Sequence, residues 1–496
     1  AMDNTQVDLS LGLATAPIDV QVIKIGQKTN TYSQAEIISD VNKYLNTMFS
    51  MIPQGLSTST TPSNNLQAGA ISSVRGNIKT VLDSNINAKS HVKGLTKQDG
   101  KDVLTNELDL NSFTLVGGAG SASVGVRDVQ IANNTVAEIK DGKVESTDGD
   151  VSVNAQSEAN VKMTNTSAEI SGLQISGGSD IYENSSETLA QIQDSNVNAQ
   201  SIGINSKSKS HATIDTTHVA GSIGSVVNVD LVEAKDTNKT VSLITGNTNI
   251  NANDKLTIRS TVDTDLQSLK LSVPIAGASL VSVLKNEATA NTISKAIIEN
   301  VNGAINTNGL EIITDYDNMS VTARSNIVSV KAINVAEYND SGAFMNANFK
   351  SGIDSIDGLI LKNTGTTQIT TAKANSEKDV LAYGRTHDVS VQGIGIYTGT
   401  FANAKTEATS ATVLKVKDHT SNTLKINQYL NSKAKADANG TKVTAAGVYA
   451  VAAEATDESK MTLDIGGNNK ILNRADIKAT HKATTEADLK ADRKSV

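Results

Sequence analysis

The feature that most constrains this chain is an imperfect repeat of about 50–60 residues that runs through most of its length. A short block returns with the same order of apolar and polar residues at Val197–Ile204, Ile250–Ile258 and Ile305–Ile312. Each copy has a β-branched residue, an Asn-rich stretch that predicts a turn, and an apolar-x-apolar strand. Self-similarity of this kind indicates stacked units, and stacked units make an elongated protein.

A second block, rich in Gly, Ala and Val, also returns along the chain. Its copies begin roughly 52 to 64 residues apart, just beyond the usual range of repeat periods, at Val219, Ile275, Ile327, Val391 and Val443. Between the blocks, β-branched residues alternate with polar ones, which is the pattern of half-buried strands. This alternation argues against disorder, although only 38% of the residues are apolar.

The repeat predicts an all-β fold, an elongated right-handed parallel β-helix (β-solenoid). Corresponding strands of successive units can bury their apolar positions if they lie side by side, about 4.8 Å apart, in parallel. Asn at the turns tolerates the left-handed backbone that sharp corners need. Crossovers between parallel strands are nearly always right-handed, which sets the expected hand.

The length of one coil follows from an assumption about strand length. If short strands of roughly 4–7 residues alternate with turns, one coil uses roughly 20–25 residues, and each repeat makes about two coils. The chain then has about 20 coils and forms a rod on the order of 100 Å. An array of immunoglobulin-like sandwiches and a trimeric stalk are the alternative folds, but the chain has no Trp and no sustained heptads.

The first 60 residues differ from the rest and are predicted to form a separate unit, residues 1–60, ahead of the solenoid at 61–496. Two alternating stretches, Leu9–Leu13 and Ile18–Ile25, predict strands. Ser33 and Glu36 fit a capping box for a helix at about 33–52, the one helical insertion expected. Its apolar face is expected to pack on the stack, with partner binding as the alternative. Both chain ends look like cuts in a longer chain.

Composition limits the partners and the compartment. The net charge is −8 with both signs interspersed, so we expect no nucleic-acid partner. No apolar run is long enough for a membrane span. The chain has no Cys, which suits either a cytosolic protein or a bacterial protein that crosses envelope layers unfolded.

A search for chemistry predicts no catalytic, cofactor-binding or metal site. The six His residues show no metal-ligand spacing, and a shared site for His211 and His218 is disfavoured. The Gly-rich run Val116–Gly125 lacks the Lys of a phosphate loop and reads as a tight strand or turn. The acidic runs Asp141–Asp150 and Asp99–Asp102 match no calcium loop and read as hydrophilic turns. We therefore expect a protein that is not an enzyme.

The repeat texture from about residue 105 to the end resembles a family of giant exported bacterial proteins. The residues that carry the likeness are the Asn-Ala-x-x-Ile/Leu-x-Ile blocks, the Gly/Ala-rich Val/Ile strands, and the lack of Cys and Trp. The family is that of leukotoxin-like filamentous adhesins of the fusobacterial type, related in design to filamentous haemagglutinin and exported by type V (two-partner) secretion. The resemblance implies export through an outer-membrane transporter barrel, an extracellular or cell-surface location, and host-cell adhesion or leukocyte toxicity.

Three functions follow as hypotheses from different classes. The leading one is a secreted or surface-displayed virulence factor, an adhesin or leukotoxin, whose rod binds a host cell-surface receptor or glycan. The second is a structural spacer that holds a distal active region away from the cell. The third is a polysaccharide-processing β-helix enzyme, which the scarcity of aromatic residues, 3% of the chain, disfavours.

Overall fold

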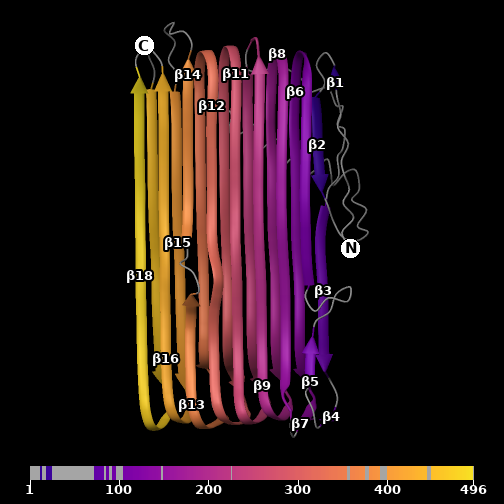
Figure 1. Cartoon of the computed structure of the whole chain (residues 1–496), viewed down its shortest axis with the longest axis vertical. Helices are drawn as coiled ribbons and strands as arrows, with labels where there is room; N and C mark the ends of the chain where they lie inside the picture. The colour runs from indigo at the N-terminus through magenta and orange to yellow at the C-terminus, as the bar shows by residue number, and fades with distance from the viewer. Residues whose placement is uncertain are drawn as a thin grey trace.

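The computed structural model is a single stack of parallel β-strands (Figure 1). It describes residues 12–13, 18–24, 72–82, 85–88, 92–95, 104–146, 149–224, 226–354, 358–374, 379–390, 399–443 and 448–494. The strands are β1 (Gly12–Leu13), β2 (Ile18–Lys24), β3 (Ser72–Leu82), β4 (Asn85–Ala88), β5 (Val92–Leu95), β6 (Leu104–Lys140), β7 (Lys143–Ser146), β8 (Val151–Gln193), β9 (Asn196–Ser222), β10 (Val226–Gly246), β11 (Asn249–Val301), β12 (Gly303–Asp354), β13 (Leu359–Ala374), β14 (Asp379–Ser390), β15 (Gly399–Lys417), β16 (His419–Val443), β17 (Val448–Gly466) and β18 (Lys470–Lys494). The all-β parallel solenoid predicted from the repeat is confirmed.

Each repeat forms one coil, so the prediction of two coils per repeat is wrong. From β3 onward, strand partners in neighbouring coils are separated by a whole repeat, from 49 residues between Gly399 and Val448 to 63 between Ala336 and Gly399. The predicted short strands are replaced by long ones, such as the 27 residues of β9. The Asn- and Ser-rich stretches that looked like turns lie within these strands, because their side chains stack on like side chains of the next coil.

The long strands also change the shape expected from the sequence. The longest axis of the molecule runs along the strands, and the coils stack across it (Figure 1). A strand of 27 residues spans roughly 90 Å. One coil per repeat leaves roughly 40 Å along the stacking axis, instead of the rod on the order of 100 Å. The chain is therefore a broad, flat stack.

The first repeat block was aligned correctly from the sequence. Ile250 pairs with Val197 on one side and with Ile305 on the other. A register shift after Ala252 absorbs the extra residue that separates Ile250 from Leu256. The Asn-rich stretch therefore makes a kink in a continuous strand and does not reverse the chain.

The second block was placed in the correct part of the coil but in the wrong register. Val219 pairs with Val273, whereas Ile275 pairs with Gly221 and with Val330. The slip between Val219 and Ile275 is two residues and keeps every side chain on its face, so alternation alone does not fix that register. The slip between Ile275 and Ile327 is three residues, and Ile327 is buried whereas Ile275 is exposed. Val391, which begins one copy of the block, lies outside the described residues.

Each coil crosses the stack twice and contributes to two facing sheets. Sheet 1 contains 104–117 of β6, β7, 151–171 of β8, β9, 249–276 of β11, 303–331 of β12, β13, β14, β16 and β18. Sheet 2 contains β3, 120–140 of β6, 174–193 of β8, β10, 280–301 of β11, 336–354 of β12, β15 and β17. We call the end where sheet 1 strands begin the lower end, as in Figure 1, and the end where the chain passes to sheet 2 the upper end.

Hydroxyl pairs join the two sheets across the interior. Ser206 bonds to Ser242 at 2.8 Å and Ser208 to Thr240 at 2.6 Å. The same position is occupied by Ser157 with Thr188 in the coil before and by Ser260 with Ser294 in the coil after. Buried hydroxyls must be hydrogen-bonded to be tolerated, so these pairs fix how the two legs of each coil face each other. All members of this row are small residues: Ser157, Thr188, Ser206, Ser208, Thr240, Ser242, Ser260 and Ser294.

The lower turns use a left-handed residue at a recurring position, as the sequence led us to expect for sharp corners. Asp141, Asp194 and Asn300 have φ of 53°, 48° and 54°, and Gly246 has 73°. The carboxylate of Asp194 accepts a hydrogen bond from the backbone N–H of Asn247 in the next coil at 2.8 Å. Asp and Gly share this position with Asn, because each adopts the left-handed conformation at low cost.

The interior is divided into zones along the strands. An apolar cluster lies at the lower end, where Ile204, Ile244 and Ile258 are fully buried. The hydroxyl row follows, and then a second apolar cluster that includes Ile214 and Val232. A group of buried charges separates this second cluster from a small apolar group at the upper end. The interior is thus neither uniformly apolar nor uniformly polar.

The amino-terminal region is described only in part. β2 pairs in parallel with β6, with Ile18 opposite Ala122, so this strand is a member of the stack. The helix predicted at 33–52 lies outside the described residues. In the part of the chain that the structure describes, no helix has the length and apolar character of a membrane span.

Candidate functional site

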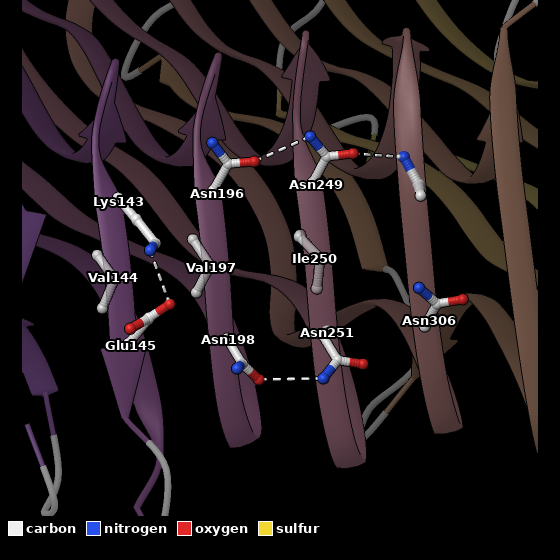
Figure 2. A pocket seen from close by; sticks show the side chains of 11 residues that line it. Lys143, Val144, Glu145, Asn196, Val197, Asn198, Asn249, Ile250, Asn251 and Asn306 are labelled. Atoms are coloured by element: carbon white, nitrogen blue, oxygen red, sulfur yellow. Dashed lines mark hydrogen bonds and ion pairs between the residues drawn. The ribbon is translucent and has the colours of Figure 1, made fainter. Parts of the chain in front are cut away.

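A shallow groove on the outer face of sheet 1, near the lower end, is the candidate site. It has a volume of about 200 Å³, and Figure 2 shows its lining on the neighbouring strands β7, β9, β11 and β12. Outward side chains alternate with buried ones along each strand. Val144, Val197 and Ile250 are the buried residues beneath the groove, and their side chains pack in the core. The lining residues of the groove are Lys143, Val144, Glu145, Asn196, Val197, Asn198, Asn249, Ile250, Asn251, Ala304 and Asn306.

Two rows of asparagine amides border this groove, which we call the amide groove. In the lower row in Figure 2, the Asn251 amide donates to the Asn198 side chain at 3.0 Å. In the upper row, the Asn249 amide donates to Asn196 at 2.9 Å and accepts from the backbone N–H of Ala304 at 2.9 Å. These bonds hold the amides in one orientation, so that the groove presents fixed donors and acceptors.

The amide groove is nearly neutral. Its one ion pair joins the Lys143 ammonium to the Glu145 carboxylate at 2.9 Å, at the edge formed by β7. An amide has two N–H donors and one carbonyl acceptor, and each ladder bond uses only part of that capacity. Asn196, Asn249 and Asn251 are exposed, although Asn251 also donates to Asn253 at 3.3 Å. The groove can therefore exchange hydrogen bonds with a neutral, hydroxyl-rich ligand that lies across the coils.

A second cluster of chemistry-bearing residues is buried between the sheets near the upper end. The carboxylate of Asp230 accepts hydrogen bonds from the Asn228 amide at 2.9 Å and lies 3.2 Å from the Lys270 ammonium. The His218 ring nitrogen Nδ1 lies 3.0 Å from the same carboxylate. These residues come from three strands of consecutive coils, β9, β10 and β11. We call His218, Asn228, Asp230 and Lys270 the buried charge cluster.

The charges of this cluster stabilise one another. Burial alone raises the pKa of Asp230, but the Lys270 ammonium and the His218 ring outweigh it and hold that pKa well below the usual range. The side chains of His218, Asp230 and Lys270 are at most 2% exposed. The cluster is therefore an interior network that is closed to solvent, and we do not treat it as a substrate-binding site.

Another buried carboxylate, Asp236, has no cation in direct contact among the described residues. Amide groups of Asn184 and Asn238 donate to it at 2.7 and 2.9 Å. Burial raises the pKa of Asp236 to about 7, against the lowering effect of hydrogen bonds from Ser210 and Asn184. This carboxyl group titrates near neutral pH while remaining inside the stack.

The structure separates the two histidines whose shared site the sequence disfavoured. Both lie on β9 with no turn between them, and their odd spacing puts them on opposite faces. His211 faces outward and contacts Asp263 at 2.8 Å, whereas His218 faces inward to Asp230. His419 contacts Asn469 at 3.0 Å, and its burial lowers its pKa. His481 is exposed on β18.

Where the structure describes the Gly-rich and acidic runs named in the sequence analysis, they lie at turns and at crossings between the sheets. The Gly-rich run Val116–Gly125 belongs to β6, where the coil passes from sheet 1 to sheet 2. Asp141 takes a left-handed turn position, and Asp150 accepts a hydrogen bond from the backbone N–H of Ser201 at 3.1 Å. The run Asp99–Asp102 lies outside the described residues. Among the residues that are described, no three His, Asp or Glu side chains gather as metal ligands do.

Sequence reasoning missed both the amide groove and the buried charge cluster. The Asn-x-Asn spacing of Asn196 with Asn198 and of Asn249 with Asn251 was visible, but it was read as turn chemistry. Lys270 alternates with Leu269, Leu271 and Val273 in a predicted strand, so either the lysine or the aliphatic residues must face inward. A lysine that faces inward needs a buried partner of opposite charge. The partner of Lys270, Asp230, is 40 residues away in the chain, on β10, so the contact depends on how the strands are placed against one another.

Comparisons of the chain with protein-family models, with curated proteins and with solved structures found no match.

Proposed function

We propose that this chain is an extracellular binding scaffold of a bacterial surface, an adhesin-like protein whose amide groove holds hydroxyl-rich chains such as host-cell glycans. The observation that carries the proposal is the pair of aligned amide rows, Asn196 with Asn249 and Asn198 with Asn251. A sugar chain needs donors and acceptors at regular spacing. A stack of coils repeats them about every 4.8 Å.

The electrostatics of the groove favour a neutral ligand. A phosphate- or sulfate-rich partner requires clustered cations, and the one Lys here, Lys143, is paired with Glu145. The floor between the amide rows carries no aromatic residue on which a sugar ring can stack. We therefore expect weak binding per groove, strengthened when many copies are displayed on one surface. Export through an outer-membrane barrel rests on the family resemblance alone.

A glycan array, followed by binding to host epithelial cells and leukocytes, tests this proposal with the purified chain. The double variant Asn198→Ala/Asn251→Ala removes the amide row formed by these two residues. We expect its apparent affinity for the glycan to fall at least tenfold. The matched control is Asn154→Ala/Asn205→Ala, because that pair also forms an outer amide bond on sheet 1, at 2.9 Å, but lies outside the groove. Absence of binding to any glycan or cell, or an equal loss in the control, contradicts the proposal.

A structural spacer is the second candidate, and one observation favours it. The strand ladders between neighbouring coils are continuous, so a coil can be removed in register. Gly246 occupies the turn position of Asp194, and Gly467 that of Asp418. Deleting residues 195–246 removes the groove strand β9, whereas deleting residues 419–467 removes a distant coil. A spacer keeps its function after either deletion in a chain that folds, but a groove-based adhesin loses binding only with the first. Deleting 195–246 also removes His218 and Asp230, so folding of both variants is checked by circular dichroism. Polysaccharide processing stays a prediction.

A further inference from the structure

One segment of sheet 1 is inside out. In residues 269–276 of β11, Lys270 and Ser272 are buried, with 4% and 1% of the whole residue exposed. The alternate residues Leu269, Leu271 and Val273 therefore face outward, where they are half-buried by their neighbours, and Ile275 is 44% exposed. A strand that buries a lysine and presents aliphatic side chains to the surface reverses the usual arrangement.

The reversal has a cause inside the molecule. Lys270 contacts Asp230 at 3.2 Å, and the Asn228 amide donates to the Ser272 hydroxyl at 3.0 Å. Because side chains alternate strictly, fixing Lys270 inward forces Leu269 and Leu271 outward. The interior explains the orientation of the strand, but it leaves the aliphatic outer surface without a function in the monomer.

The neighbouring strands extend this apolar surface. Val219 of β9 pairs with Val273, and on the next row Ile170 and Ile275 both pair with Gly221. Ile170 and Ile223 are 67% and 88% exposed, the largest values among the exposed large apolar residues. Contiguous apolar surface of this kind marks an interaction site. We call it the outer apolar face, composed of Ala168, Ile170, Val219, Ile223, Leu269, Leu271, Val273, Ile275 and Val328.

Two charges of opposite sign flank this face symmetrically. Leu269 pairs with Asp215 on β9 and with Arg324 on β12, so the three residues form one row with the apolar one in the middle. Asp215 and Arg324 both face outward and are exposed. No ion pair joins either of them to another described residue. They stand on opposite sides of β11, two strand spacings apart.

We propose that a second copy of this chain docks on the outer apolar face and forms a twofold dimer whose axis lies in the interface, close to the direction of β11. Such an axis exchanges left and right, so β9 of one copy faces β12 of the other. Asp215 then meets Arg324 of the second copy, and Arg324 meets its Asp215. Leu269, Leu271 and Val273 face their own counterparts along the axis. The surface is self-complementary, as an isologous interface requires.

The remaining rows agree with this pairing. The same operation sets Thr217 of β9 opposite Asn326 of β12, a polar pair, and Val219 opposite Val328, an apolar pair. Twisted sheets that pack face to face cross at about 30°. The amide groove lies on the same outer face, some twenty residues further down the strands and roughly 65 Å away. The residues of the outer apolar face are thus distinct from those that line the amide groove.

Charge reversal tests the twofold arrangement directly. Sedimentation velocity on the whole chain is expected to show a dimer. Asp215→Arg alone places Arg against Arg at both contacts, and Arg324→Asp alone places Asp against Asp, so each variant is expected to dissociate at least tenfold more readily. An equimolar mixture of the two variants restores both attractive contacts and is expected to dimerise. The double variant D215R/R324D is expected to dimerise as well.

Two further variants complete the test. Leu271→Glu changes an outward residue on the axis and is expected to give a folded monomer, with folding followed by circular dichroism. Glu187→Lys is the control, because Glu187 pairs with Lys239 on the outer face of sheet 2 and is expected to leave the dimer intact. A wild-type monomer at the highest soluble concentration overturns the proposal. So does a mixture of the two charge variants that stays monomeric, whether or not Leu271→Glu folds.

Discussion

The two ends of sheet 1 follow opposite rules. At the lower end the strands bury Val197, Ile250 and Ile305 and expose asparagine amides. At the upper end β11 buries Lys270 and turns the half-buried Leu271 outward. The same strand, β11, takes part in both arrangements. Alternation places every second side chain of a strand on the same face. Contacts with the neighbouring coil, such as that of Lys270 with Asp230, decide which of the two alternating sets faces inward.

The largest expected effect comes from removing the cation at the upper end. Lys270→Met leaves Asp230 buried with one positive neighbour fewer. Breaking a buried pair in this way costs about 3–5 kcal/mol of unfolding free energy, measured by denaturant titration. The double variant Lys270→Met/Asp230→Leu is expected to recover much of this loss. If Lys270→Met and the double variant lose the same unfolding free energy, packing and not the ion pair holds this segment of β11 in its observed orientation.

A buried acid between the two ends gives a pH-dependent prediction. The pKa of Asp236 is raised to about 7, so the folded state holds a proton that the unfolded chain releases near pH 4. The contribution of Asp236 to stability is then greatest in acid and falls by up to about 4 kcal/mol as the pH rises from 4 to 7. Asp236→Asn is expected to flatten this slope in denaturant titrations over that pH range. An unchanged slope in the variant would assign the dependence to other groups.

The lower end is expected to behave as an ordinary apolar core. Ile258 is fully buried in the cluster there, and Ile258→Ala should cost about 2–5 kcal/mol through lost burial and the cavity that remains. The effect should not vary with pH, since no titratable group belongs to that cluster. A clear pH dependence in this variant would remove the distinction between the two ends.

The smallest of the four effects concerns the turn at the lower end. A Cβ at Gly246, whose φ is 73°, would lie 2.3 Å from Oδ1 of Asp194. Gly246→Ala is therefore expected to cost about 1–3 kcal/mol, from the backbone conformation and the close contact together. Adding Asp194→Ala should recover part of the loss, which a double-mutant cycle on thermal unfolding can measure. Strict additivity would mean that the two coils do not contact through this turn.

Much of the fold could be predicted because it depends on local pattern. The parallel stack and the alignment of Val197, Ile250 and Ile305 followed from the repeat and from alternation. Coil length could not be predicted in the same way. Asn and Ser in mid-repeat favour turns in an isolated chain, and only stacking on Asn and Ser of the next coil keeps them extended.

The candidate sites depended on register, which the sequence did not fix. Ile275 was aligned with Val219 but pairs with Gly221, and a shift of two residues leaves every side chain on its original face. Such a shift changes which residues are neighbours across strands. The meeting of His218, Asp230 and Lys270, and the row of Asp215, Leu269 and Arg324, therefore became visible only when the strands were placed side by side.

The great length of each coil has a mechanical consequence. A pull that peels the stack open from one end must break an entire strand ladder before the next coil is loaded. Lys239 contacts Glu187 in the neighbouring coil, and the two residues are 52 apart in the sequence. One coil therefore contains about 52 residues. At up to about 3.4 Å per residue, one detached coil lengthens the tether by roughly 170 Å, while the stack shortens by only about 4.8 Å. The protein can thus give way in large, discrete extensions under load and keep the rest of the stack folded.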